Sequence, residues 1–151
     1  MGFSRLNWGV KASFRAYVEG MEGTISVSDG ATRADDGTFV FEALPGGDLS
    51  ISDDGSASGS IRFQGTVAFE AHGGMLKSTL TELGLETGED GLLLTVKDQM
   101  GDDRCAIATV EHIQSESGGS VTLRTEITMD GMYQIADNYP PGTELDPIKL
   151  A

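Results

Sequence analysis

The sequence has few of the residues from which metal centres are usually built. It holds one cysteine, Cys105, and two histidines, His72 and His112. One cysteine closes no internal disulfide and supports no Cys-based metal cluster, and two histidines make no protein-only zinc site unless carboxylates join them. Cys105 stands in the apolar run at residues 105–108, which favours a small, buried hydrophobic side chain.

Positive charge is scarce as well. Ten Lys and Arg residues stand against 24 Asp and Glu residues, so the net charge is -14. Binding to nucleic-acid phosphates or to anionic membranes needs clustered cations, and the composition therefore argues against both kinds of partner. Solubility is the favoured meaning of the acidity.

Long apolar runs are also absent. No stretch approaches the roughly 20 residues of a membrane span, and the N-terminus lacks the basic-then-apolar layout of a signal peptide. The chain as written therefore predicts a cytoplasmic protein. A mature segment of an exported or cell-surface protein would have the same features, so that alternative stays open.

The motifs of covalent catalysis are missing too. There is no Gly-x-Ser-x-Gly motif and no plausible pairing of Cys with His in the sequence. The glycine-rich stretches do not open helices in a βαβ setting, which makes them turns and not phosphate cradles. The residues alone indicate no enzyme.

What the sequence does contain is the pattern of a turn-rich β protein. The 151 residues, with 38% hydrophobic residues and 21 glycines, suit one domain over residues 1–151. Alternation of apolar and polar residues predicts strands at 24–28, 38–42, 61–70, 75–85, 92–96, 104–113 and 121–128. Leu49 and Ile51 indicate a short strand. Residues 52–60 read as a solvated hairpin tip, because a calcium loop would need a glutamate that is not there.

Two helices complete the prediction. Residues 8–20 form the first, with one apolar face made of Val10, Phe14, Tyr17, Val18 and Met21. We expect Asn7 to cap its start and Gly20 or Gly23 to end it. Residues 129–136 predict a second, short helix. The fold class is therefore mainly β, an antiparallel β-sandwich or open barrel with one N-terminal helix and one short C-terminal helix.

Aromatic and polar side chains occur close to glycine or proline residues at three places in the sequence. Ser13 lies four residues before Tyr17 and shares its helix face. His72 ends a strand just before two glycines that permit a bulge or sharp turn. Tyr139 sits in the rigid turn at residues 138–142. From the helix pattern alone, Tyr17 reads as a core tyrosine with its hydroxyl satisfied.

These places carry a resemblance to a known family. WGVKxSFRxY at residues 8–17 resembles the opening motif of the HtaA-type haem-binding domains of actinobacterial haem-uptake proteins. FxGxVxFxxHGGxL at residues 63–76 resembles the central motif, and TxDG at 128–131 with YPxGTxLDP at 139–147 resembles the closing one. The three occur in the family's order and span nearly the whole chain. Ile135 and Asn138 depart from the family, whose members often have Phe there.

The resemblance implies a small β-rich domain that holds one ferric haem b. It implies that Tyr17 ligates the iron, that His72 supports Tyr17, and that Tyr139 lies near the pocket. The partners it allows are haem, another haem-carrier protein and a second copy of the chain. The function it implies is haem uptake, relay or storage without catalysis. The alternative is a degenerate member that serves as a β-sandwich interaction domain without haem.

General chemistry agrees with such a site. A free phenol titrates near pH 10, so a tyrosine binds iron at neutral pH only when a strong Lewis acid such as ferric haem replaces its proton. A nearby imidazole can hydrogen-bond the phenolate oxygen and tune it. For the apolar wall the candidates are Phe14, Val18, Phe39, Phe41 and Met75. For the propionates they are Ser13, Lys11 and Arg15.

Overall fold

The structure is a computed structural model that describes residues 3–52, 54–89, 91–99, 101, 103–116, 118–136 and 139–151. Five residues of the expected loops and turns lie outside these ranges, namely Asp53, Asp90, Met100, Asp102 and Asn138. The helical elements are α1 (Ala12–Gly20), the 3-10 turn η1 (His72–Gly74) and α2 (Met129–Gln134). None of the helices in the described ranges has the length and apolar character needed to cross a membrane.

The strands are short, and all the pairs they form within the described residues are antiparallel. They are β1 (Arg5–Trp8), β2 (Thr24–Ser28), β3 (Thr32–Arg33), β4 (Phe39–Glu42), β5 (Ser50–Ile51), β6 (Ala57–Ser58), β7 (Ser60–Arg62), β8 (Thr66–Ala71), β9 (Leu76–Thr81), β10 (Gly84–Gly88), β11 (Gly91–Lys97), β12 (Arg104–Ser115), β13 (Val121–Ile127) and β14 (Ile148–Leu150).

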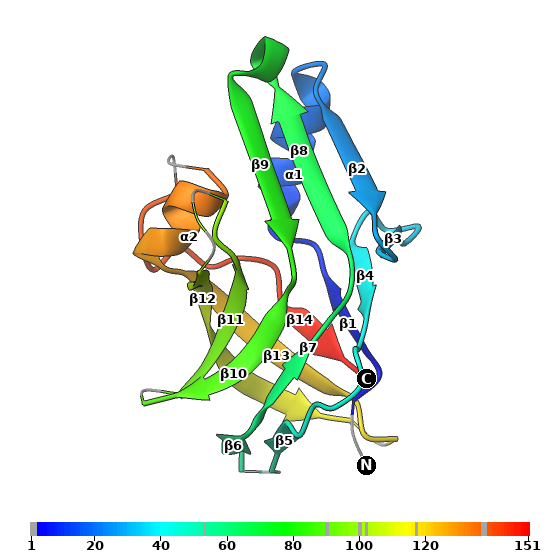
Figure 1. Cartoon of the computed structure of the whole chain (residues 1–151), viewed down its shortest axis with the longest axis vertical. Helices are drawn as coiled ribbons and strands as arrows, with labels where there is room; N and C mark the ends of the chain where they lie inside the picture. Colours follow the sequence, from blue (N-terminus) through cyan, green and yellow to red (C-terminus); the bar gives the residue numbers. More distant parts are fainter. Residues whose placement is uncertain are drawn as a thin grey trace.

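Most of these strands form one curled antiparallel sheet. Within the described ranges its order is β3-β4-β1-β14-β13-β12-β11-β10-β7, while β2-β8-β9 and β5-β6 form two smaller sheets. Figure 1 shows the large sheet curling like an open half-barrel, with the β8–β9 arm rising from it and the β5–β6 hairpin at the other end. The predicted fold class, mainly β with an N-terminal helix and a short C-terminal one, is confirmed.

The two terminal strands differ from the prediction. Trp8, assigned to the helix, lies in β1, and no strand was predicted at β14. Both strands lie in the middle of the large sheet, where Leu6 pairs with Leu150 and both side chains are fully buried. Strands of three or four residues offer too short an alternation to recognise, and their pairing joins opposite ends of the chain.

The start of α1 also differs. Asn7 is not its N-cap, because Asn7 pairs within β1 and its amide donates to Thr38 Oγ1 at 2.9 Å. Lys11 occupies the cap position without a side-chain bond, and the Asp146 carboxylate accepts instead from Ala12 N at 3.0 Å. The helix ends at Gly20, as one of the two expected stops. A carboxylate from the far end of the chain thus supplies the missing cap.

Two predicted strands are each divided in two by a bend. Residues 61–70 split into β7 and β8 around Gly65, whose φ of 123° suits glycine and whose position leaves no room for a Cβ beside Ala31. Residues 75–85 split into β9 and β10 around Glu82, with φ at 54°. The bends lift β8 and β9 out of the large sheet to pair with each other and with β2. This arm carries η1 at its tip and packs under α1 (Figure 1).

Candidate functional site

Tyr17 and His72 meet at the tip of the β8–β9 arm. The Tyr17 hydroxyl lies 2.6 Å from His72 Nε2, and the two ring centroids are 5.6 Å apart. Phe14 and Val18 turn the buried face of α1 to the sheet, which leaves Tyr17 44% exposed. Reading Tyr17 as a core tyrosine was therefore wrong, since the side chain stands at the surface with its hydroxyl bound to an imidazole.

The backbone around His72 is built to present that imidazole. His72, Gly73 and Gly74 all have positive φ, at 56°, 65° and 97°. A tight turn of this kind joins β8 to β9 and confirms the sharp turn expected from the two glycines. A left-handed histidine is uncommon, and such strained positions concentrate at functional sites.

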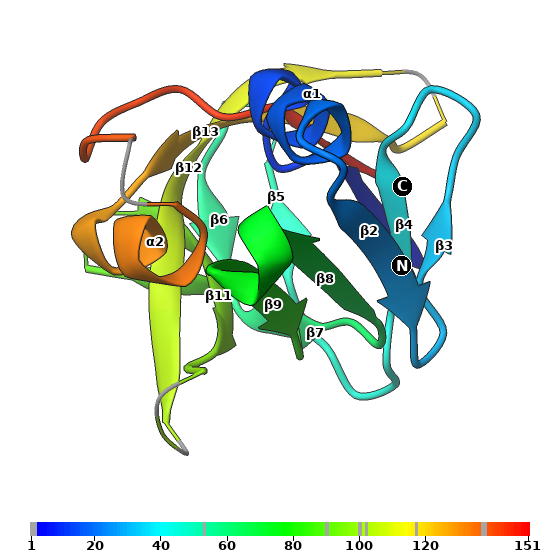
Figure 2. The same cartoon turned by 90° about the horizontal axis from the view of Figure 1, so that it is seen from above.

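An open groove of about 550 Å³ begins at this pair. One wall holds Tyr17 and His72, and the other is the helix α2 with the residues after it; the lining comprises Tyr17, His72, Met75, Leu76, Lys77, Met132, Tyr133, Ile135 and Ala136. Seen from above, α1 and α2 stand on different sides of η1 (Figure 2). The groove combines polar and apolar surface, and among its large hydrophobic and aromatic side chains Met75 at 90% and Tyr133 at 71% are the most exposed.

The far wall is held in place by hydrogen bonds to α2. Thr128 Oγ1 accepts from Gly131 N at 2.9 Å and donates to the Ala106 carbonyl at 2.6 Å. Gly131 packs against the Ile107 carbonyl so closely that no Cβ would fit. These contacts pin the first turn of α2 onto β12.

The last turn of α2 is fixed by Gln134, which is only 5% exposed. Its side chain donates to Asp98 Oδ1 at 3.0 Å and accepts from Gln99 Nε2 at 2.8 Å. Its carbonyl accepts from Ser78 Oγ at 2.5 Å and from Gln99 Nε2 at 2.8 Å. This polar network ties α2 to β9 and to the segment that directly follows β11, and it fixes the position of the groove's second wall.

The other predicted site residues lie beside the groove and do not line it. Ser13 Oγ is 3.1 Å from the Tyr139 hydroxyl, one helical turn before Tyr17, and the Tyr139 ring meets Phe14 edge-on at 6.3 Å. Phe14 itself is in the core. The predicted wall is likewise buried in the core at Val18, Phe39 and Phe41, and Met75 alone among the candidates faces the groove.

The cations predicted for the propionates are already engaged. Arg15 forms a 2.7 Å ion pair with Asp146 and donates to the Gly9 carbonyl, and Lys11 Nζ donates to the Glu144 carbonyl. Lys77, which sequence reasoning missed, lines the groove instead. Its place near the two glycines, on the strand that follows His72, is the signal that points to it. Met132 and Tyr133 were missed because only the docking of α2 brings them there.

Comparison with known proteins identifies the family of the chain. The HtaA family model, described as Htaa, matches residues 4–151. The chain belongs to the HtaA family. The resemblance drawn from the three motifs is thereby confirmed. No protein in the curated comparison matches it.

Three solved structures share the fold over nearly the full chain. The C-terminal domain of HtaA from Corynebacterium glutamicum has 26% identity and a TM-score of 0.72, with 99% of this chain and 96% of that one covered. The N-terminal domain of the same protein has 24% identity and a TM-score of 0.77, with 99% and 97% covered. The haem-binding protein HtaB of that organism has 20% identity and a TM-score of 0.70, with 98% and 91% covered.

Proposed function

We propose that the protein binds ferric haem b in the groove, with the Tyr17 oxygen as axial ligand and His72 as its hydrogen-bonding partner, for uptake, relay or storage of haem. The observation that carries the proposal is the 2.6 Å contact between a half-exposed phenol and an imidazole at the wall of an open groove with both polar and apolar lining. Membership of the HtaA family and the fold shared with a haem-binding protein support it.

The pair supplies the proton chemistry that a phenolate ligand needs. Ferric haem provides the Lewis acid that makes a phenol a ligand at neutral pH. His72 Nε2, in hydrogen-bond contact with the hydroxyl, is placed to take the phenol proton. The same nitrogen then donates a hydrogen bond back to the phenolate oxygen, which holds its orientation and tempers its basicity.

The rest of the groove suits a flat apolar ring that carries two carboxylates. Its volume of about 550 Å³ falls within the usual range for cofactor sites, and Met75, Tyr133 and Ile135 offer apolar surface to a macrocycle. Lys77 adds positive charge for a carboxylate, and among the described residues it forms no ion pair. Exchange of Lys77 for glutamine should weaken binding in the titration below; unchanged affinity would remove Lys77 from this role.

The decisive experiment is a hemin titration followed by visible absorption, with wild type, Tyr17→Phe and Tyr133→Phe side by side. We expect wild type and Tyr133→Phe to give a saturable one-to-one spectrum of ferric phenolate. Tyr17→Phe should lose that spectrum and bind at least tenfold more weakly. An unchanged spectrum in Tyr17→Phe would move the ligand to another residue. Absence of saturable binding in all three would favour an interaction domain without haem.

A further inference from the structure

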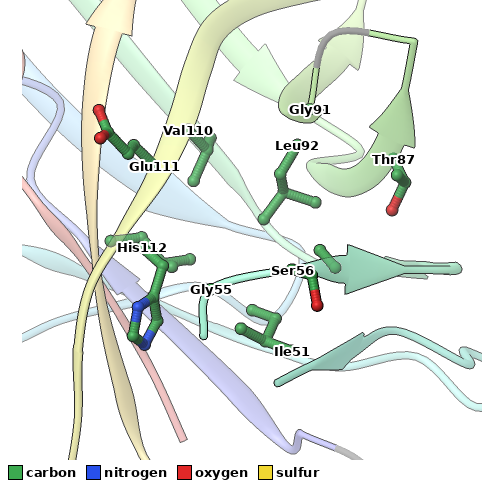
Figure 3. A pocket seen from close by; sticks show the side chains of 11 residues that line it. Ile51, Gly55, Ser56, Thr87, Gly91, Leu92, Val110, Glu111 and His112 are labelled. Atoms are coloured by element: carbon green, nitrogen blue, oxygen red, sulfur yellow. The ribbon is translucent and has the colours of Figure 1, made fainter. Parts of the chain in front are cut away.

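The arginines of the described residues divide into those that have a carboxylate partner and those that have none. Ion pairs join Arg15 to Asp146, Arg33 to Glu19 and Arg124 to Glu111. Figure 3, a close view of the cavity beneath the β5–β6 hairpin, shows the Glu111 carboxylate pointing away from Leu92 and Ile51, and Arg124 donates to it at 2.6 Å. Arg62 and Arg104 form no ion pair within the described ranges, although the chain has 24 acidic residues.

Arg62 and Arg104 lie side by side on one face of the large sheet. β7, β10, β11 and β12 are consecutive strands of that sheet (Figure 1), and Gly84 of β10 pairs with Arg62 on one side and with Thr95 on the other. Arg104 reaches over β11 to this point, where its Nη2 donates to Thr95 Oγ1 at 2.7 Å. A Cβ on Gly84 would lie 2.8 Å from Arg62 Cδ and 3.0 Å from Arg104 Nη2. The missing side chain of Gly84 therefore makes room for two arginines over a single point.

A third cation lies next to this pair. Lys97 of β11 is directly opposite Arg104 in the register, and it follows Thr95 by two residues, so its side chain leaves the same face of the sheet. Like charges directly opposite each other destabilise a sheet. Lys97 forms no ion pair in the described part of the chain, and Asp98, the next residue, accepts instead from Gln134 Nε2 at 3.0 Å. Three of the ten cations thus gather without a carboxylate bound between them.

The nearest carboxylates compensate only part of this charge. Burial of the Arg104 side chain and the charge of Arg62 lower the pKa of Arg104, while Glu82 and Glu86 act in the opposite direction. The net shift is downward, and neither glutamate forms an ion pair in the described ranges. The cluster therefore keeps a local attraction for an anion from solution.

Most N–H donors of the cluster are unused. The exposed Arg62 side chain makes no hydrogen bond to another described residue. Arg104 donates only through Nη2, and its Nε is the one buried side-chain polar atom of the described residues without a partner. Orphaned donors of this kind are rare in folded proteins. Two neighbouring guanidinium groups offer the planar fork that binds oxyanions through paired hydrogen bonds.

We propose that Arg62, Arg104 and Lys97 form a binding site for a phosphate group, either the free dianion or the terminal group of a small phosphate ester. A tetrahedral dianion presents enough oxygens to accept from all three cations and offsets their mutual repulsion, which a carboxylate with one charge and two oxygens does less well. None of the three residues lines the Tyr17–His72 groove, so the site is independent of the haem function proposed above.

The test is a titration of inorganic phosphate into the full chain without haem, followed by NMR of the arginine Nε–H groups and the backbone amides. Sodium chloride holds the ionic strength constant. We expect saturable shifts of Arg62, Arg104 and Gly84 with a dissociation constant on the order of a millimolar. The Nε–H of Arg124, which is paired with Glu111, should not move. No saturable shift at Arg62 and Arg104, or an equal shift at Arg124, would overturn the proposal.

Parallel titrations with phenyl phosphate and with acetate define the ligand. Tighter binding of phenyl phosphate than of inorganic phosphate would assign the site to a phosphate ester, and weaker binding would assign it to the free ion. Acetate should bind at least tenfold more weakly than either. Equal affinity for acetate would contradict a phosphate site.

Variants separate this cluster from the general positive charge of the chain. Arg62→Gln, at an exposed position, should weaken phosphate binding at least tenfold, whereas Arg5→Gln, exposed in β1, should leave it unchanged. Gly84→Ala keeps every charge but pushes the two arginines apart, so it should also weaken binding. Equal affinity of Arg62→Gln and wild type would contradict the site. The Arg62→Gln result stands by itself if Gly84→Ala fails to fold.

Discussion

His72 has a left-handed backbone, φ 56°, in which a non-glycine residue is uncommon. A glycine at position 72 would adopt this φ without strain, so we infer that the histidine is present for its side chain and not for its backbone. That side chain contacts Tyr17, and Tyr17 is the one groove residue with a phenol inside hydrogen-bond distance of an imidazole among the described residues. The strain at His72 thus serves the presentation of a ligand pair.

This division of roles predicts the effect of removing the imidazole. His72→Ala leaves the Tyr17 oxygen in place but removes the proton acceptor, and we expect hemin affinity to fall 10- to 100-fold at neutral pH. The loss should shrink as the pH rises, because a phenol then deprotonates without help. Hemin titrations at several pH values measure this. His112→Ala is the matched control and should bind hemin like wild type; equal loss in both variants would contradict a specific role for His72.

At the scale of elements, the groove depends on how α2 is docked. Its six residues are too few to be stable alone, and the packing and hydrogen bonds of its ends hold it. Gln134 makes most of the polar contacts at the last turn, to Asp98, Gln99 and Ser78. A polar anchor, in place of an apolar one, fixes a single orientation, because other orientations leave buried donors and acceptors unpaired.

We therefore predict that Gln134→Leu loosens the groove wall. The variant should lose about 2–3 kcal/mol of unfolding free energy, since the Gln99 backbone N and Nε2 both lose the Gln134 Oε1 acceptor in a part-buried place. Hydrogen exchange of α2 should accelerate more than that of β13. Urea unfolding and hydrogen exchange measure the two effects. Gln114→Leu, on the exposed part of β12, should stay within about 0.5 kcal/mol of wild type, and equal losses would refute the anchor.

The elements also show which features the sequence made predictable. Long alternations marked β2, β12 and β13 correctly, and the motifs pointed to Tyr17 and His72 together. The bends were harder, because Glu82 has a positive φ that no residue preference announces. The position of the α2 wall could not be predicted either, since the groove exists only after Gln134 docks. Local pattern thus predicts strands and turns, whereas the cavity between elements depends on tertiary contacts.

At the scale of the whole molecule, the first and last strands of the chain, β1 and β14, pair with each other inside the large sheet. β14 lies between β1 and β13, and Ser4 N donates to the Ala151 carbonyl at 2.6 Å. Asp146, shortly before β14, adds to these contacts. Its carboxylate forms an ion pair with Arg15, and its backbone carbonyl accepts from Trp8 Nε1 at 2.8 Å. Residues 146–151 therefore hold both the sheet and the helix that carries Tyr17.

This closure predicts a large effect from a small change near the C-terminus. Ile148 is fully buried between the central strands, so Ile148→Ala should cost about 3 kcal/mol of unfolding free energy. Lys149→Ala, next to it and exposed, should cost less than about 0.5 kcal/mol. Urea unfolding compares the two. Because β1 leads directly into α1, Ile148→Ala should also weaken hemin binding by Tyr17 as the temperature approaches unfolding, well before Lys149→Ala does. Equal stability of the two variants would show that the sheet closes without β14.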